Sequence, residues 1–335
     1  MVGDISVALE SAIGELHSVN AETKILALNT RIEAARAGVH GSAFSVVAAE
    51  MQNLSDRTSE IANQMAHRTR SETSALIETI ETAIRGTRLS DLALVNIDLI
   101  DRNLYERTCD VRWWATDGSL VNALASPTPE SVQFASKRLG VILDAYTVYH
   151  DLVLCDVEGR VIANGRPDRF QSQGAGQANA TWFSQAIRSR SGDEYGFQTA
   201  HRSGLIDQKA ALVYSCGVRE GGESQGKILG ALGILFDWRG LADPILNHVP
   251  VRPSEQKTTE CYIVDDRGHI LASNRGDRIG ESLELPEMER VGQVAKGFYQ
   301  TRFADRNVCV GHAKSPGFET YSTGWHSIII QPIET

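Results

Sequence analysis

Apolar positions in the first 65 residues form two helical repeats, separated by a Gly-x-x-Gly break. Each repeat advances in alternating steps of four and three residues. Two arms with matching heptads around a short break predict an antiparallel coiled-coil hairpin over 1–70. The repeating positions are Ile5, Leu9, Ala12, Leu16, Val19, Thr23, Leu26 and Thr30 before the break, and Val47, Met51, Leu54, Thr58, Ile61 and Met65 after it.

The break itself has the composition of a tight connection between two helices. Gly38 and Gly41 supply the backbone freedom that a chain needs to leave one helix and enter the next, because the residue past a helix C-terminus often takes a positive φ. The residues just before the break have small side chains, namely Ala34, Ala35 and Ala37. The two arms can therefore close tightly at this end.

Beyond the hairpin, the second arm continues as a longer helical pattern. The heptad lapses between Met65 and Leu76 and then resumes at helical spacings as far as Leu104. We predict one long helix over 44–110, with a hinge at 66–72 or at Gly86. Its part 71–110 is predicted to connect the hairpin to the domains that follow.

The second half of the chain contains an internal repeat. Residues 152–164 and 261–273 share an apolar strand, an Asp-x-x-Gly turn and a second strand, which is the pattern of a β-hairpin. Further strand-like runs follow each copy. We therefore predict an α+β chain in which two modules with antiparallel sheets follow the helices, with the matched pairs Asp156 and Asp265, Gly159 and Gly268, and Ala163 and Ala272.

The modules are predicted at 111–247 and 257–335, joined by a Pro-containing segment. Asp156 and Asp265 are predicted to be turn residues that bond their own backbone. Trp113 and Trp114, where the long helix ends, are predicted to anchor it on the first sheet or to line a pocket mouth.

Residues 22–65 resemble the signalling tip of methyl-accepting chemotaxis proteins. The resemblance implies a homodimer, possible trimers of dimers, and docking of a chemotaxis histidine kinase and its coupling protein. By position, Glu33 and Arg36 would make contacts between dimers, and Asn29 and Val46 would lie on the docking surface. The matching residues are Asn29, Glu33, Ala34, Ala35, Arg36, Ala37, Gly38, Gly41, Phe44, Val46, Val47, Ala48, Glu50 and Leu54.

The hairpin also departs from that pattern at charged positions. Val39, Ser42 and Ala43 stand where the family has Glu, Arg and Gly. Two charged groups expected on the face for the kinase and coupling protein are therefore missing. The alternative hypothesis is a ligand-binding and assembly protein whose tip only oligomerises the chain.

Residues 90–335 resemble a double Cache sensor domain, which is built from PAS-like modules. The resemblance implies that the first module binds a small molecule between its sheet and the facing segment 166–189. Aromatic walls with a few convergent polar groups suit such a site. The candidates are Trp182 and Phe183 as the wall, Tyr195, Tyr214 and Asp237 as polar groups, and Arg166, Arg169, His201 or Lys209 as a source of positive charge.

Each of these candidates has a structural alternative. Trp182 and Phe183 can be core aromatics between helix and sheet, and Asp237 can cap the helix that follows it. Ala180 and Leu235 stand where amino-acid-binding members of the family carry an Arg and an Asp. Recognition of amino acids in the usual manner of the family is therefore not expected.

Composition narrows the possible functions of the chain. It has 335 residues, 42% of them hydrophobic, with a net charge of −9. That is enough for two or three globular domains, and it disfavours binding to nucleic acid. The longest apolar run, 228–236, is far shorter than the roughly 20 residues of a membrane-spanning helix. With no secretion signal in the first ten residues, a cytoplasmic location is expected.

Cysteines and histidines add no recognisable chemistry. The five cysteines are scattered without a C-x-x-C pair, and they are expected to be reduced and mostly buried. The nine histidines lack metal-ligand spacing. No phosphate loop or nucleophile motif is found either, so we expect a non-enzymatic protein without metal or cofactor.

Overall fold

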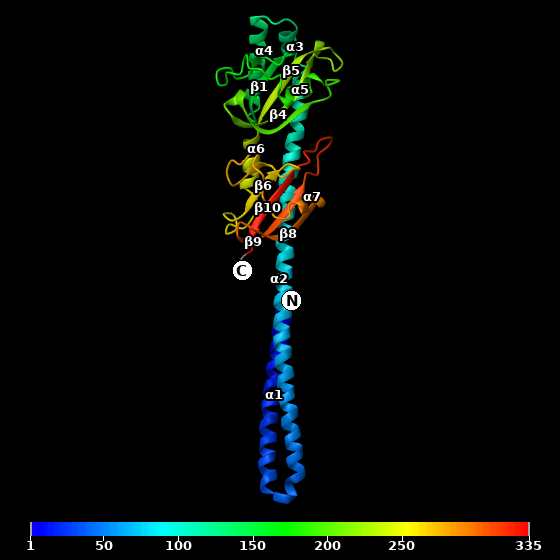
Figure 1. The fold of residues 1–335 in the computed structure, drawn as a ribbon, viewed down its shortest axis with the longest axis vertical. Helices are drawn as coiled ribbons and strands as arrows, with labels where there is room; N and C mark the ends of the chain where they lie inside the picture. The colour runs from blue at the N-terminus through cyan, green and yellow to red at the C-terminus, as the bar shows by residue number, and fades with distance from the viewer. Residues whose placement is uncertain (1, 334–335) are drawn as a thin grey trace. The chain divides into compact units, whose positions relative to one another are not determined.

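The computed structural model describes residues 2–333, with side chains described from residue 7 onward (Figure 1). The chain divides into two compact units, Met1–Ile84 and Arg85–Thr335. Helix α2 (Ser42–Trp114) contributes its first half to one unit and its second half to the other. Each unit is described separately below.

The first unit is a helical hairpin, as predicted. Helix α1 (Val2–Arg36) connects through the 3-10 turn η1 (Gly38–Gly41) to α2, and the two helices lie side by side (Figure 1). Gly38 has a φ of +63°, which favours glycine. At Gly41 an added Cβ would lie 2.1 Å from the carbonyl oxygen of Ala34. Both glycines are therefore required by the turn.

The arms meet along a seam of small side chains that recur every seven residues. Asn20 and Ser55 face each other in this seam, where Asn20 Nδ2 donates to the Ser55 carbonyl oxygen at 2.6 Å and Ser55 Oγ donates to Asn20 Oδ1 at 2.5 Å. Because most of the other members are alanine or glycine, the two backbones can approach closely. The buried positions are Ile13, Asn20, Ala27, Ala34, Gly41, Ala48, Ser55 and Ala62.

This seam corrects the predicted packing of the hairpin. The bulky heptad positions do not close the two arms of one chain, because the small residues next to them already do so. Instead they form an exposed apolar stripe along both arms, and Ile5 lies outside the described side chains. The stripe residues Leu16, Val19, Leu26, Val47, Leu54, Ile61 and Met65 are each between 46% and 65% exposed.

Helix α2 is continuous, and neither predicted hinge is found in it. Residues 66–72 are helical, and so is Gly86. An added Cβ at Gly86 would lie 2.1 Å from the ring of Phe298, so this glycine permits close packing of the helix against β8 (Lys296–Phe303). Its presence reflects tertiary contact and not a break in the helix.

The first module forms a five-stranded antiparallel sheet with the strand order β2-β1-β5-β4-β3. Its strands are β1 (Tyr149–Asp156), β2 (Val161–Asn164), β3 (Gly196–Ser203), β4 (Lys209–Arg219) and β5 (Ile228–Asp237). Its helices are α3 (Gly118–Ala125), α4 (Pro129–Ala145), α5 (Thr181–Ile187) and α6 (Trp238–Asn247), with 3-10 turns η2 (Gly204–Ile206) and η3 (Glu220–Gly222).

The second module repeats this topology with the order β7-β6-β10-β9-β8. Asp156 and Asp265 each accept a hydrogen bond from a backbone N–H of their own turn, as predicted. Gly159 and Gly268 have φ values of +82° and +81°. The remaining elements are β6 (Glu260–Val264), β7 (Ile270–Ser273), α7 (Glu289–Gln293), β8, β9 (Arg306–Lys314) and β10 (His326–Pro332).

The second half of α2 packs against both sheets and forms the centre of the larger unit. An added Cβ at Gly311 on β9 would lie 2.4 Å from Leu89 Cβ, which shows how closely the helix approaches the second sheet. These contacts remove a full apolar face of the helix from water. The fully buried helix positions are Leu89, Ala93, Ile97, Ile100, Leu104 and Val111.

The opposite face of the second sheet buries two histidines. His312 on β9 is 2% exposed and His326 on β10 is 6% exposed. Their Nδ1 atoms have no hydrogen-bond partner among the described residues. Burial, together with the neighbouring His326, lowers the pKa of His312 from 6.5 to about 4. Burial also lowers the pKa of His326.

We predict that His312 makes the stability of the larger unit depend on pH between 6.5 and 4. In this range the unfolded histidine binds a proton and the folded one does not, so stability is lost as the pH falls. The full effect is on the order of 3 kcal/mol. Urea unfolding followed by tryptophan fluorescence measures it, because all five tryptophans lie in Arg85–Thr335.

His312→Gln should remove the contribution of His312 to this pH dependence. The slope that remains should come from His326 and from the buried carboxyl of Asp151, whose pKa is raised. The exposed His248 provides the matched control, since His248→Gln should leave the pH dependence as in the wild type. An unchanged slope in His312→Gln would show that the assignment to His312 is wrong.

Candidate ligand-binding site in the first module

Helix α5 covers the face of the first sheet that points away from α2. Trp182 is 2% exposed and Phe183 is 4% exposed, and their rings meet edge to face with centroids 5.9 Å apart. An added Cβ at Gly233 on β5 would lie 2.8 Å from the Trp182 ring, so the strand carries a glycine where the indole rests. The predicted aromatic pair is thus packed directly on the sheet.

The segment that leads to α5 is held by a buried carboxylate on β1. Asp151 is fully buried, and its Oδ1 accepts hydrogen bonds from the N–H groups of Gly165 and Arg166, each at 3.0 Å. Its Oδ2 accepts one from Asn164 Nδ2 at 2.8 Å. Burial raises the pKa of Asp151, and these bonds offset only part of that effect. Asp151 thus fixes the start of the loop over the sheet.

Two cationic side chains lie on the aromatic layer at its edge. The guanidinium of Arg169 lies 5.1 Å from the ring centroid of Phe170, and Nζ of Lys209 lies 5.7 Å from the same centroid. Phe170 is buried, whereas Arg169 is exposed. These distances are typical of cation–π contacts.

A polar cavity of about 350 Å³ adjoins this edge. It contains cations of the first module and carboxylates of both modules, and Arg239 Nη1 lies 3.6 Å from Asp277 Oδ2. Arg202 also pairs with Asp277. Such a concave site with a few converging charged groups has the features of a small-molecule site. The lining residues are His150, Arg202, Asp207, Gln208, Lys209, Ala210, Asp237, Arg239 and Asp277.

Asp237 has two partners within the protein. It caps α6 by accepting a hydrogen bond from the N–H of Gly240 at 3.0 Å, and its Oδ1 lies 3.3 Å from His150 Nε2. Burial raises the pKa of Asp237, but the bonds from His150 and Gly240 outweigh burial and bring it below 3.8. Asp237 is therefore ionised at neutral pH, with one side facing the cavity.

The structure does not bring all the predicted residues together. Tyr214 on β4 lies in the core on the α2 side of the sheet, opposite Trp182. Its hydroxyl lies 2.6 Å from that of Tyr321 in the second module, so Tyr214 links the two modules. The ring of Tyr195 lies 6.3 Å from the Tyr214 ring. His201 on β3 contacts the Thr199 carbonyl oxygen through Nδ1 at 2.8 Å.

Sequence reasoning missed several residues that line the cavity. The predicted site residues do not include His150, Arg202, Arg239 and Asp277. The sequence around Arg239 contains one recognisable pattern, an ion pair with Asp243 four residues later, which the structure shows at 3.0 Å. No sequence pattern near Asp277 indicates its place in the cavity, because it reaches the cavity from the other module.

Within residues 2–333, no set of three or more His, Cys, Asp or Glu side chains is arranged to hold a metal ion. None of the described helices combines the length and the apolar character needed to cross a membrane.

Comparison with known families agrees with this architecture. Residues 49–335 match the family model of the Cache domain, and residues 3–91 match that of the methyl-accepting chemotaxis protein signalling domain. The chain belongs to the Cache domain family. It joins this Cache domain to an N-terminal segment that matches the methyl-accepting chemotaxis protein signalling domain. Both resemblances drawn from the sequence are confirmed.

Curated relatives match short stretches of the chain. The methyl-accepting chemotaxis protein McpG of Pseudomonas putida is 54% identical over 48 residues, which are 14% of this chain and 8% of McpG. HlyB of Vibrio cholerae, also a methyl-accepting chemotaxis protein, is 35% identical over 89 residues, 26% of this chain and 16% of HlyB. The chain thus matches less than a fifth of the length of either relative.

A solved sensor domain matches most of the chain. The ligand-binding domain of the Campylobacter jejuni chemoreceptor Tlp3, in complex with 4-methylisoleucine, aligns with a TM-score of 0.55 and 12% identity. The alignment covers 75% of this chain and 92% of that domain. This likeness confirms the predicted α+β fold with two antiparallel sheets.

Proposed function

We propose that the chain senses a small molecule in its first module, 111–247, and relays occupancy through α2 to the hairpin 1–70. The polar cavity beside the aromatic layer carries this proposal. Asp237 and Lys209 offer opposite charges in it. Trp182 and Phe183 belong to the aromatic layer and do not line the cavity. We infer binding and signalling, not catalysis.

The charges of the cavity point to a ligand with an ammonium group and an acidic group. An ionised Asp237 can accept hydrogen bonds from an ammonium, and Lys209 or Arg239 can meet a carboxylate. Ala180 and Leu235 stand where amino-acid binders carry their Arg and Asp. We propose that the charged residues of the cavity bind the ligand in place of that Arg and Asp. The ligand named in the Tlp3 structure, 4-methylisoleucine, has both groups.

Relay requires a ligand that binds two arrangements of the protein with different affinity. The cavity draws Asp237 and Arg239 from the first module and Asp277 from the second. A ligand bound there contacts both modules. Because both sheets pack on α2, a change in the angle between the modules changes how the helix is held.

The output end is proposed to be an assembly of several chains in the cytoplasm. The exposed apolar stripe of the hairpin fits a homodimer, which can associate further into trimers of dimers at the tip. Glu33 and Arg36 are exposed and pair at 2.9 Å, so they are available for contacts between copies. Asn29 and Val46 are exposed as well, as a docking surface for a chemotaxis kinase and coupling protein requires.

A second candidate function is assembly without kinase control. It is favoured by Val39 and Ser42, which replace two charged residues of the signalling-domain pattern. In that case the hairpin only oligomerises the chain, and ligand binding would serve another partner.

We predict that at least one compound in a set of amino acids, amines, purines and organic acids raises the thermal midpoint of the full chain. A ligand that binds only the folded state stabilises it by mass action. Asp237→Asn should reduce the shift at equal concentration, because asparagine keeps the helix cap but removes the charge. Tryptophan fluorescence during heating measures the midpoint.

Asp168→Asn is the matched control, because Asp168 is an exposed carboxylate of the same module. It should keep the full shift. If Asp237→Asn binds the same compound as tightly as the wild type, the ligand does not occupy this cavity.

We predict that the full chain is a dimer held by the apolar stripe. The double substitution Leu26→Lys and Leu54→Lys should give monomers, since burying charge at both positions costs more than the lost apolar contact alone. Sedimentation velocity measures the oligomeric state. Glu22→Lys changes charge at an exposed position of α1 and should leave the dimer intact. A monomeric wild type would contradict this prediction.

We predict that the chain co-sediments with a chemotaxis histidine kinase and its coupling protein. Val46 is 65% exposed near the start of α2, and Val46→Lys should weaken recruitment at least tenfold while the dimer persists. Glu22→Lys again serves as the control. No recruitment under any ligand condition would eliminate kinase control and favour the assembly protein.

A further inference from the structure

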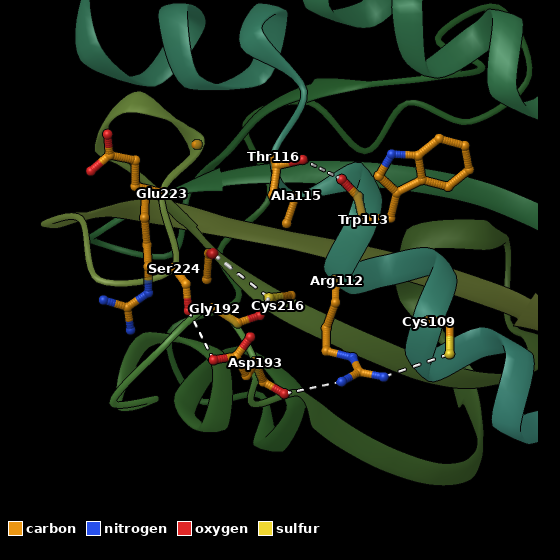
Figure 2. Close-up of a pocket in the computed structure, with 13 residues that line it drawn as sticks. Cys109, Arg112, Trp113, Ala115, Thr116, Gly192, Asp193, Cys216, Glu223 and Ser224 are labelled. Carbon is orange, nitrogen blue, oxygen red and sulfur yellow. Dashed lines mark hydrogen bonds between the residues drawn. The ribbon is translucent and has the colours of Figure 1, made fainter. Parts of the chain in front are cut away.

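A second cavity, of about 370 Å³, lies at the C-terminal end of α2 (Figure 2). Four segments of the first module surround it: the end of α2, the loop before β3, the end of β4 and the connection to β5. The residues that line it are Cys109, Arg112, Trp113, Ala115, Thr116, Gly192, Asp193, Cys216, Gly217, Arg219, Gly222, Glu223 and Ser224.

This cavity is separate from the proposed sensory site. The two share no lining residue. The side chain of Cys216 belongs to the core on the α2 side of the first sheet, whereas Trp182 belongs to the layer on the other side. Trp113 is 69% exposed, and Figure 2 shows its ring pointing away from Arg112 and Asp193.

Arg112 carries a guanidinium whose outer nitrogens are weakly engaged. Its Nε donates to the Thr108 carbonyl oxygen at 2.8 Å, which fixes the side chain along its own helix. Nη1 then lies 3.4 Å from the Asp193 carbonyl oxygen, and Nη2 lies 3.6 Å from Cys109 Sγ. The contact to the carbonyl oxygen is long for a charged donor, which normally lies about 2.7–2.9 Å from an oxygen acceptor. The other contact is to sulfur, which is a weak acceptor. The two Nη atoms are therefore ready to donate to a better acceptor.

Arg219 adds a second positive charge that the protein leaves without an anion. It is 7% exposed and donates to the carbonyl oxygens of Gly226 at 2.9 Å and Ser189 at 2.6 Å. Its Nε is buried without a partner among residues 2–333. In that same part of the chain, neither Arg112 nor Arg219 lies within 4.0 Å of a carboxylate oxygen. A buried guanidinium without a counter-ion is costly.

The other lining groups restrict which anion fits. Burial raises the pKa of Cys216 to about 11 despite the nearby Arg219, so this thiol is neutral and does not balance the guanidinium charge. Asp193 and Glu223 are exposed at the rim, and Asp193 Oδ2 accepts a hydrogen bond from Ser224 Oγ at 3.0 Å. These acids disfavour an anion of high charge. A single negative charge is therefore preferred over a phosphate dianion.

We propose that this cavity binds a small carboxylate anion, with both Nη atoms of Arg112 donating to its two oxygens and Arg219 providing the second positive charge. The planar fork of arginine matches a carboxylate in this way. The anion would join the end of α2 to the loop that carries Asp193. The site goes beyond the proposed sensory function and stands whether or not the hairpin signals.

The test uses the full chain with sodium acetate and sodium propionate, against sodium chloride at the same ionic strength. We expect saturable binding of at least one carboxylate by titration calorimetry, and none of chloride. Arg112→Gln should weaken that binding at least tenfold. Arg138→Gln removes a half-exposed arginine elsewhere in the module, one that pairs with Asp117, and should keep the affinity within twofold.

Hydrogen exchange on the wild type locates the site without a variant. The bound carboxylate should slow exchange in 188–194 and 220–226. If Arg112→Gln fails to fold, Arg112→Lys keeps the charge but loses the fork, and should also weaken binding. Protection only elsewhere, binding of inorganic phosphate alone, equal effects of chloride, or full affinity in the Arg112 variants would each overturn the proposal.

Discussion

The buried carboxylate of Asp101 on α2 holds the larger unit together. It is fully buried, and it accepts hydrogen bonds from Ser315 Oγ at 2.6 Å, Gly317 N–H at 2.9 Å and Thr323 Oγ1 at 2.9 Å. A buried charge is tolerated only when such bonds satisfy it. The loop between β9 and β10 is therefore fixed to the middle of the helix, and its shape depends on one side chain.

That loop in turn reaches the first module. Tyr321 shares a hydrogen bond with Tyr214 at 2.6 Å, and the ring of Trp325 lies 5.5 Å from that of Trp238. Trp238 Nε1 also donates to the Leu271 carbonyl oxygen at 2.6 Å. Helix, first sheet and second module thus share one core. Any motion that separates two of them exposes buried hydroxyl and indole groups, so a change in the angle between the modules is expected to shift the helix as well.

Local chemistry explains which features could be predicted from the sequence. The hydrogen bonds of each Asp-x-x-Gly turn lie within five residues of the chain. Both hairpins, and with them the repeated sheet, could therefore be predicted. The side of the sheet on which Tyr214 lies could not be predicted. The strand ALVYSCGV is buried on both sides, so its residues show no alternation of apolar and polar positions. The predicted hinge at Gly86 is not found, because this glycine makes room for the ring of Phe298, which is distant in sequence. The cavity with Asp237 needs Asp277 from the other module, which no local pattern reveals.

In the hairpin, unlike in the larger unit, the small residues are buried and the bulky apolar residues are exposed. Its seam is built from small residues such as Ala27 and Ala48, which bury little apolar area and bring the arms close. The bulky residues, among them Leu26 and Leu54, are left outside. Long helices gain most of their stability from packing an apolar face. One hairpin alone leaves that face in water, and the proposed dimer would cover it. A change at α2 that alters how two stripes pair would therefore alter the tip itself, and this route needs no hinge within the helix.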